Sequence, residues 1–206
     1  MVLEQEMKLS VLGNAQVDLA QLVFQGFQCS EIVEQRLIST YFDTPDLMLL
    51  KKSVGLRLRF NGSQWFQTVK ESGQVKNGLH QRYEWEDKIP TNDFDLSLLK
   101  QTPLNTLIDD KTIWTNISQL FTTDFIRQTI LVSDENTSIE LAYDKGTISN
   151  EEKTIAIHEI ELELKRGNIN QLQALSTQLM TQLPLKTTNK SKAQLGYALR
   201  STKVQL

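Results

Sequence analysis

The sequence predicts an α+β fold in which antiparallel strands close into a barrel with a charged interior, covered on the outside by helices. Three observations predict it. Many segments alternate charged with apolar residues, which is the period of a strand. Turn signals such as Asn61-Gly62 separate several of them, as in hairpins. Two further segments have the apolar spacing of an amphipathic helix. A charged interior is costly unless its charges pair or bind a metal or ligand, so this fold predicts a functional site.

The chain begins with a predicted strand and a predicted helix. Glu4, Glu6 and Lys8 alternate with other residues, so a strand over residues 3–10 has one charged face. Apolar residues then recur near helical spacing, which predicts a helix over residues 14–25.

The middle of the chain has the pattern of hairpin-connected strands followed by a cover. The predicted strands are residues 35–43, 54–60, 64–71 and 80–88. Residues 90–124 show little alternation, and we expect them to form short helical or irregular pieces that cover the sheet.

Three more strands and a helix complete the predicted domain. The strands are residues 125–133, 137–144 and 154–165, and turn-forming residues connect them. Leucine and isoleucine at helical spacing predict a closing helix over residues 168–182. The two predicted helices are expected to cover the apolar face of the sheet.

Composition limits the class of protein. A chain of 206 residues suits a single domain, residues 1–206. A net charge of −3 gives no general affinity for nucleic acid or an anionic membrane. The single cysteine, Cys29, suits a reducing compartment, and we expect it to be buried. Neither a signal peptide nor a membrane span is recognisable, so a cytoplasmic protein is expected.

Charges on the other strands sort in the same way as those of the first strand. Basic residues on alternating positions are Arg57, Arg59, Lys70, Arg82 and Arg127, and an acidic run contains Glu159, Glu161 and Glu163. Either acidic run by itself is more often a solvent-exposed face of a sheet. The whole set favours a charged interior with a metal site. His80 and His158 have no metal-binding spacing and are expected on the surface or the second face. Trp65, Trp85 and Trp114 are expected to pack under helices.

These residues together resemble the CYTH superfamily, the triphosphate tunnel metalloenzymes, over nearly the whole chain. The resemblance rests on Glu4-x-Glu6-x-Lys8, Gly55 to Arg59, Lys70, the Arg82/Glu84/Glu86 strand, Arg127, Glu140 to Gly146 and the Glu159/Glu161/Glu163 strand. Gly78 to Arg82, Leu120 to Phe125, Ser191-Lys192-Ala193 and Gly196-Tyr197 are most similar to bacterial inorganic triphosphatases.

The resemblance implies a closed tunnel of roughly eight antiparallel strands that holds one small ligand. It implies metal-dependent hydrolysis of tripolyphosphate to pyrophosphate and phosphate, with Mg²⁺ or Mn²⁺ as cofactor. The expected substrate-binding residues are Lys8, Arg57, Arg59, Lys70, Arg82, Arg127 and Lys192. The expected metal ligands are Glu4, Glu6, Glu159 and Glu161. Lys70 is also expected to neutralise charge on the reacting phosphoryl group. A carboxylate could accept the proton of the attacking water, and Glu163, Asp144 and Glu84 are all open for this role. Glu163 is kept as a candidate catalytic residue and is also a weaker candidate for a metal ligand.

Two alternatives stay open at this point. One is an enzyme of the same superfamily that acts on an organic triphosphate: a class IV adenylyl cyclase, a thiamine triphosphatase or a nucleoside triphosphatase. The other is a polyphosphate-binding module without turnover, which the many carboxylates disfavour because they would weaken pure anion binding. Inorganic triphosphate is the expected partner, without nucleic acid or membrane, and the oligomeric state is open. Many similar bacterial proteins carry a second helical domain, so a stand-alone enzyme and an excised domain both fit.

Overall fold

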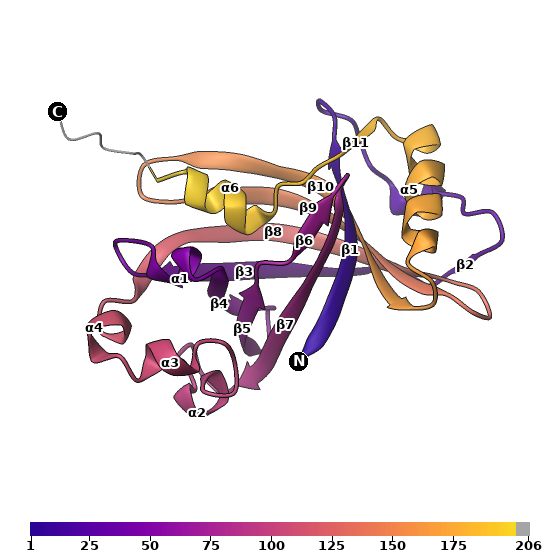
Figure 1. Ribbon diagram of the computed structural model, residues 1–206. Coiled ribbons are helices and arrows are strands. Elements are labelled where there is room, and N and C mark those ends of the chain that lie inside the picture. Colours follow the sequence, from indigo (N-terminus) through magenta and orange to yellow (C-terminus); the bar gives the residue numbers. More distant parts are fainter. Residues whose placement is uncertain (201–206) are drawn as a thin grey trace.

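The computed structural model describes residues 1–200 and contains the predicted closed barrel (Figure 1). Residues 201–206 of the predicted domain lie outside this range. Within residues 1–200, eight strands pair in a ring, and every pairing in it is antiparallel. Their order around the ring is β1 (Val2–Val11), β10 (Thr154–Arg166), β9 (Ser138–Ser149), β8 (Ser118–Ser133), β3 (Val33–Asp43), β4 (Val54–Phe60), β5 (Trp65–Glu71) and β7 (Leu79–Ile89).

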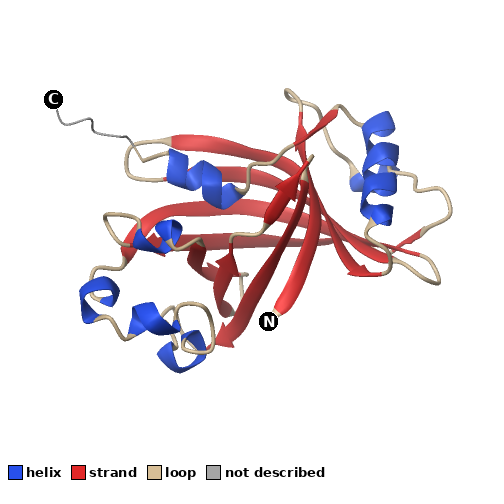
Figure 2. Cartoon of the chain, viewed as in Figure 1, coloured by secondary structure: helices blue, strands red, loops and turns tan. Residues whose placement is uncertain are grey.

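Strand β1 closes the ring because it pairs with β10 on one side and with β7 on the other. Three short strands, β2 (Gln28–Cys29), β6 (Gln74–Lys76) and β11 (Leu185–Thr187), extend β8, β7 and β1 (Figure 2). The register places Lys8 opposite Glu161 and Glu4 opposite Arg82. Residues opposite each other in a ladder share one face of the sheet, so these charges all point into the barrel.

The main apolar core lies outside the barrel wall. Helix α5 (Asn170–Gln182) packs there and places Leu172, Leu175 and Leu179 against the outward side chains of β1, β9 and β10, such as Leu9 and Ile160. A small barrel usually has its apolar side chains inside. Here β1, β9 and β10 turn an apolar face to the covering helix and charged side chains inward, as the sequence predicts.

A second apolar cluster covers β4 and β5. It is built by the short helices α1 (Met48–Lys51), α2 (Leu96–Leu99), α3 (Asn105–Ile108) and α4 (Lys111–Trp114). Trp85 and Trp114 pack against this cluster, and Trp65 lies against Phe60, so all three tryptophans pack against apolar or aromatic neighbours. The cover predicted over residues 90–124 is therefore found over residues 90–117, whereas residues 118–124 belong to strand β8.

One end of the barrel interior is apolar and is covered by helix α6 (Lys192–Ala198). Phe121 and Phe125 share the inward face of β8 with Arg127 and pack with Leu199. Gly196 is needed here because a Cβ atom at this position would lie 2.1 Å from the Phe121 ring. The close approach brings the first turn of α6 to the charged part of the interior.

The predicted helix over residues 14–25 is wrong. This segment is irregular apart from the single 3₁₀ turn η1 (Leu19–Gln21). Its backbone groups find other partners, since the side chain of Gln182 on α5 accepts a hydrogen bond from the Val23 N–H and donates one to the Val23 carbonyl. Leu19 and Phe24 are nevertheless buried in the outer core. The apolar spacing therefore marked a packed segment and not a helix.

Other sequence expectations need smaller corrections. Strand β8 begins at Ser118 and not at residue 125, because its pairing with β3 continues to that residue. Strand β9 continues to Ser149 because it stays paired with β10. Cys29 is exposed and not buried, since it lies in the short edge strand β2. His80 is buried and not on the surface, because it shares the inward face of β7 with Arg82.

Within residues 1–200, none of the helices is both long and apolar enough to cross a membrane.

Candidate active site

The barrel encloses a cavity of about 700 Å³. All seven cations predicted to bind substrate line it: Lys8, Arg57, Arg59, Lys70, Arg82, Arg127 and Lys192. They come from six different elements that are far apart in the sequence. The barrel therefore brings the whole predicted cationic set to one space.

The predicted carboxylates lie in the same region. Glu4, Glu6, Glu161 and Glu163 line the cavity, and Glu159 is buried beside it beneath Lys192. Charged lining residues that the sequence reading did not assign a role include Glu86, Glu140 and Lys165. Their positions at alternate residues of predicted strands were the available signal.

On the β1–β7 side, Arg82 contacts two carboxylates of β1, and Lys70 joins a carboxylate of β1 to one of β7. Arg82 donates to Glu4 Oε2 at 2.6 Å and to Glu6 Oε1 at 2.7 Å. Lys70 Nζ lies 2.8 Å from Glu4 and 2.7 Å from Glu84. Burial by itself would raise the pKa of Glu4, but Lys70 and Arg82 hold it well below the usual range. Glu4 is therefore ionised at neutral pH, and each of its two carboxylate oxygens already contacts a cation.

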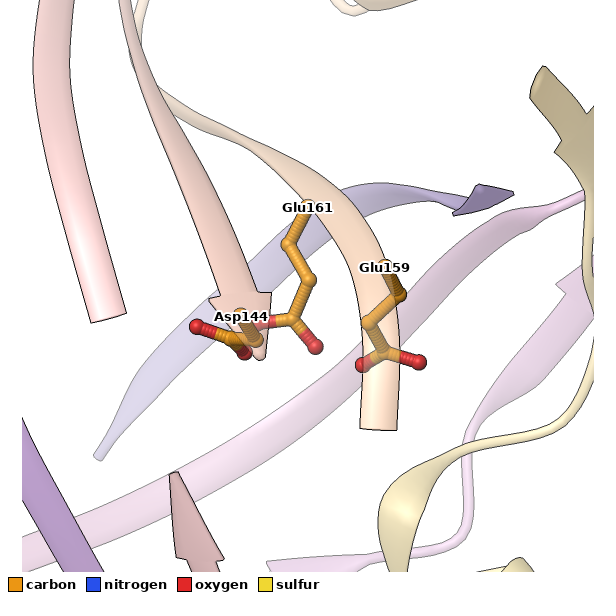
Figure 3. A group of neighbouring side chains, drawn as sticks. All are labelled: Asp144, Glu159 and Glu161. Carbon is orange, nitrogen blue, oxygen red and sulfur yellow. The ribbon is translucent and has the colours of Figure 1, made fainter. Parts of the chain in front are cut away.

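On the neighbouring strands β9 and β10, three buried carboxylates form a compact group. One oxygen each from Asp144, Glu159 and Glu161 lie within 4.8 Å of one another (Figure 3). The group exists because the β9–β10 register places Asp144 opposite Glu159, and Glu161 follows two residues later on the same face. Among residues 1–200, Glu4 and Glu6 are not part of this carboxylate group.

Three cations hold this carboxylate group together, namely Lys192, Lys8 and Arg127. Lys192 Nζ lies 2.5 Å from Asp144 and 2.9 Å from Glu161, and it also contacts Glu159. Lys8 contacts Glu161 and lies 3.0 Å from Glu6. Burial favours the neutral acid, yet these cations lower the pKa of Glu161 well below its ordinary value. The pKa of Glu159 is raised, because burial outweighs the attraction of Lys192.

The donor set of this group suits a divalent cation. Carboxylate oxygens are the ligands that Mg²⁺ and Mn²⁺ prefer, and Mg²⁺ commonly takes one or two of them with phosphate oxygens and waters. The close approach of the Asp144, Glu159 and Glu161 oxygens around a lysine ammonium fits a small cation at the same place. Asp144, which the sequence reading left open as a base, thus belongs to the candidate metal ligands.

Glu163 has a different neighbourhood. It lies on the inward face of β10, and its carboxylate is 2.8 Å from Lys165 Nζ. Burial raises the pKa of Glu163 above its ordinary value, although Lys165 opposes this. A carboxylate with a raised pKa at the cavity wall is a suitable proton acceptor.

The interior arginines are not equally neutralised. Arg57 lies 3.4 Å from Glu84 and 3.3 Å from Glu86, and its buried Nε has no hydrogen-bond partner among residues 1–200. Arg127 binds Asp144 through two bonds of 2.6 Å and also contacts Glu161 at 2.5 Å. These ion pairs position the guanidinium groups toward one region of the cavity.

Comparison with known proteins agrees with this arrangement. The model of the CYTH domain family matches residues 3–197. An inorganic triphosphatase of Haemophilus influenzae is 34% identical over 208 residues, covering 98% of this chain and 56% of that protein. The chain therefore spans about half the length of this curated relative.

Solved structures show the same fold at low identity. A Hippeastrum protein, studied as an adenylyl cyclase candidate with a dominant triphosphatase activity, has a TM-score of 0.64 and 16% identity, covering 98% of this chain and 99% of that one. A Bacillus halodurans adenylate cyclase candidate has a TM-score of 0.56 and 16% identity, covering 93% and 96%. The PH1819 protein of Pyrococcus horikoshii has a TM-score of 0.55 and 18% identity, covering 96% and 99%.

Proposed function

This chain belongs to the CYTH domain family, and we propose that it is an enzyme that hydrolyses inorganic triphosphate to pyrophosphate and phosphate with a divalent metal ion. One observation carries the proposal: the predicted cations from six separate elements line a single cavity next to a buried carboxylate group. The Haemophilus influenzae relative supports the choice of substrate.

The cations supply what phosphoryl transfer requires. A triphosphate is highly anionic, and its hydrolysis needs stabilisation of charge on the phosphoryl oxygens more than covalent chemistry. Arg57, Arg82 and Arg127 offer planar guanidinium groups for bidentate contacts, whereas Lys8 and Lys192 act as point charges. In the free protein their carboxylate partners hold these groups in place, which reduces the reorganisation needed when substrate binds.

Asp144, Glu159 and Glu161 would hold the metal ion, with Glu4 and Glu6 on the neighbouring strand β1 as further ligands. When bound, Mg²⁺ or Mn²⁺ supplies charge neutralisation at phosphoryl oxygens and lowers the pKa of a bound water. Arg127 orients two members of the set, because it contacts both Asp144 and Glu161.

Lys70 and Glu163 are the proposed reacting groups of the chain. Lys70 lies at the cavity wall between Glu4 and Glu84, where its ammonium is held ready to neutralise charge on a transferred phosphoryl group. Glu163 would take a proton from the attacking water, for which its raised pKa suits it.

An organic triphosphate is a second candidate substrate. Exposed apolar side chains gather among the residues that line the cavity, namely Met1, Val2, Leu3, Leu50 and Val75. Such a rim would contact the organic part of a substrate whose phosphates lie inside. Against it, none of the tryptophans of residues 1–200 lines the cavity, so they do not form a platform for a base. We expect no nucleic-acid or membrane partner and a cytoplasmic location.

The test is phosphate release from tripolyphosphate, ATP and thiamine triphosphate side by side, with Mg²⁺, with Mn²⁺ and with chelator. Fast metal-dependent release from tripolyphosphate with little from ATP is the expected result. Glu161→Gln, which removes a charge without changing size, is expected to be inactive in the same assay. Preference for ATP or thiamine triphosphate would establish the second candidate, and the absence of turnover with all three would reject both.

A further inference from the structure

Helix α6 is bound to the barrel at both of its ends. Lys192, its first residue, reaches the carboxylate group proposed to bind metal. Tyr197, near the other end, donates a hydrogen bond from its hydroxyl to Asp43 Oδ2 at 3.3 Å. Within residues 1–200, this is the one side-chain hydrogen bond of α6, apart from those of Lys192, that reaches beyond the helix and its N-cap.

A helix as short as α6 needs contacts of this kind. It has 7 residues, and an isolated helix of that length is not stable in water. Its capping box, in which Ser191 and Gln194 exchange hydrogen bonds, is internal and does not fix the helix in the protein. The packing of Gly196 and Tyr197 on the Phe121 ring is apolar and therefore not directional. The exact position of α6 thus depends on the polar contacts at its two ends.

Asp43 gives Tyr197 a fixed partner. Its side chain is fully buried at the end of β3. Its carboxylate accepts hydrogen bonds from the backbone N–H groups of Thr44 at 2.7 Å, Leu49 at 2.8 Å and Leu50 at 3.0 Å. Burial, together with the Asp43 carboxylate, raises the pKa of Tyr197, so the hydroxyl keeps the proton that it donates. Because main-chain donors hold Asp43, the carboxylate stays with the barrel wall if α6 moves.

The same end of the helix contacts the same turn a second time. Arg200, which follows α6, donates a hydrogen bond to the Pro45 carbonyl at 2.9 Å. Figure 1 shows α6 beside α1, the short helix to which this turn leads. One end of α6 is therefore docked on the β3–α1 connection, and the other end carries Lys192 into the site.

This arrangement affects how a metal ion would enter. An ion at the carboxylate group has to displace the Lys192 ammonium, which lies 2.5 Å from Asp144. Lys192 can give way through its own side-chain rotamers or through a shift of the whole helix. The bond between Tyr197 and Asp43 opposes the second route, because a shift of α6 would break it. Displacement of Lys192 is therefore more costly while this bond is intact.

We propose that Tyr197 is a positioning residue, whose hydrogen bond to Asp43 holds α6 in place, so that Lys192 stays at the carboxylate group and limits the affinity for the divalent ion. This inference rests on the proposed function, because it concerns the metal and substrate contacts of the same site. Tyr197 also lines the main cavity. A direct contact of its hydroxyl with substrate is therefore the alternative, and the experiment distinguishes the two.

The experiment is a double-variant cycle of Tyr197→Phe and Lys192→Met, measured as the affinity for Mn²⁺ by isothermal titration calorimetry without substrate. Tyr197→Phe removes only the hydroxyl and keeps the ring that packs on Phe121. We expect it to raise the Mn²⁺ affinity of wild-type protein about threefold. In Lys192→Met it should change nothing, because no ammonium is left to displace.

A kinetic measurement and a control accompany this cycle. Tyr197→Phe should raise KM for tripolyphosphate about threefold, since Lys192 is held less well as a substrate contact. Tyr83→Phe is the matched control, because it removes the hydroxyl of an exposed tyrosine of β7 that does not line the cavity. It should change neither the affinity for Mn²⁺ nor KM.

Three results would overturn the inference while leaving the proposed function intact. In the first, Tyr197→Phe leaves the affinity for Mn²⁺ unchanged, and a raised KM in that case would make the hydroxyl a substrate contact. In the second, Tyr197→Phe raises the affinity equally in wild-type protein and in Lys192→Met. In the third, Tyr83→Phe has the same effect as Tyr197→Phe. Absence of phosphate release from tripolyphosphate by wild-type protein with Mg²⁺ or Mn²⁺ would reject the proposed function itself, and the calorimetric cycle would still test the role of Tyr197.

Discussion

The ammonium nitrogen of Lys192 lies 2.5 Å from Oδ2 of Asp144, inside the carboxylate group proposed to bind metal. The same nitrogen contacts Glu159 and Glu161. An internal cation therefore occupies the position that a divalent ion would take, and a metal ion has to compete with it. This competition makes the affinity for metal dependent on a residue that is not itself a ligand.

Lys192→Met is expected to increase the affinity for Mn²⁺ at least about tenfold, because it removes a positive charge next to three carboxylates. Isothermal titration calorimetry in the absence of substrate measures this. Turnover should fall at the same time, since Lys192 is a proposed substrate contact. Lys190→Met, which removes an exposed lysine two residues away, is the control. Equal or weaker metal binding by Lys192→Met would contradict the competition.

Lys70→Ala is expected to lower kcat for tripolyphosphate about a hundredfold, the usual effect of removing one group that stabilises transition-state charge. Its melting temperature should change little by comparison, because Arg82 still neutralises Glu4. Lys88→Ala serves as the control, since Lys88 is exposed on the adjacent strand β7. A Lys70→Ala protein with wild-type kcat would remove Lys70 from the proposed mechanism.

Glu4→Ala and Glu161→Ala are expected to abolish metal-dependent phosphate release. Both variants also leave cations of the interior without their partners, so partial unfolding has to be separated from loss of the site. Circular dichroism and thermal unfolding, with and without tripolyphosphate, make this separation. A folded Glu161→Ala protein that keeps the wild-type rate in Mg²⁺ would contradict the metal assignment.

The free energy of unfolding of the metal-free protein is expected to decrease as the pH falls below about 4.5, the ordinary pKa of a glutamate. For Glu86, burial opposes ionisation, but Arg57 and Arg59 lower the pKa below that value. The unfolded chain then binds a proton at higher pH than the folded protein, so acid favours unfolding. In Glu86→Gln, the free energy of unfolding should decrease less between about pH 7 and about pH 3 than it does in wild-type protein. Urea unfolding at each pH measures this free energy.

The control for that experiment is Glu135→Gln, which removes an exposed carboxyl in the β8–β9 turn. It should keep the wild-type slope. If Glu86→Gln and Glu135→Gln had the same slope, the ion pairs of Glu86 would not contribute to the pH dependence.

Gly196→Ala is expected to destabilise the fold by about 1–3 kcal/mol, because its methyl group has no room against Phe121. The double variant Gly196→Ala with Phe121→Leu should be less destabilised than the sum of the two single variants, since the smaller side chain removes the ring atoms in the way. Urea unfolding of the four proteins measures the coupling. Additive effects would show that the contact between Gly196 and Phe121 does not hold helix α6 in place.

Alternation along the strands was enough to predict which charges enter the barrel. Glu4, Arg57 and Arg127 each occupy alternate positions of a strand whose other face is apolar, and period two leaves only one arrangement once the apolar side is covered. Closure of the ring was expected from the resemblance to the CYTH superfamily, because alternation by itself does not distinguish a closed barrel from an open sheet with one charged face.

The pairing of those charges could not be predicted. Asp144 meets Glu159 only through the register of β9 on β10, and Lys192 reaches both from a helix placed by Gly196 and Phe121. Such contacts depend on turn lengths and packing that no local pattern contains. The helix over residues 14–25 was wrongly predicted for a related reason. Its apolar residues pack against the outer core from an irregular segment, so their spacing reflects tertiary packing and not a helical period.

The two-sided pairing of β1 has a consequence for how the molecule is made. Its Glu6 pairs across to Glu163, so β1 has a neighbour, β10, that leaves the ribosome after all the other strands of the ring. Contacts between such distant segments slow folding, because a long loop has to close before they form. Until then, the charges of the future interior stay in water, and the edges of β1 and β9 that pair with β10 are unprotected. The nascent protein should therefore depend most on chaperones during the interval before β10 emerges.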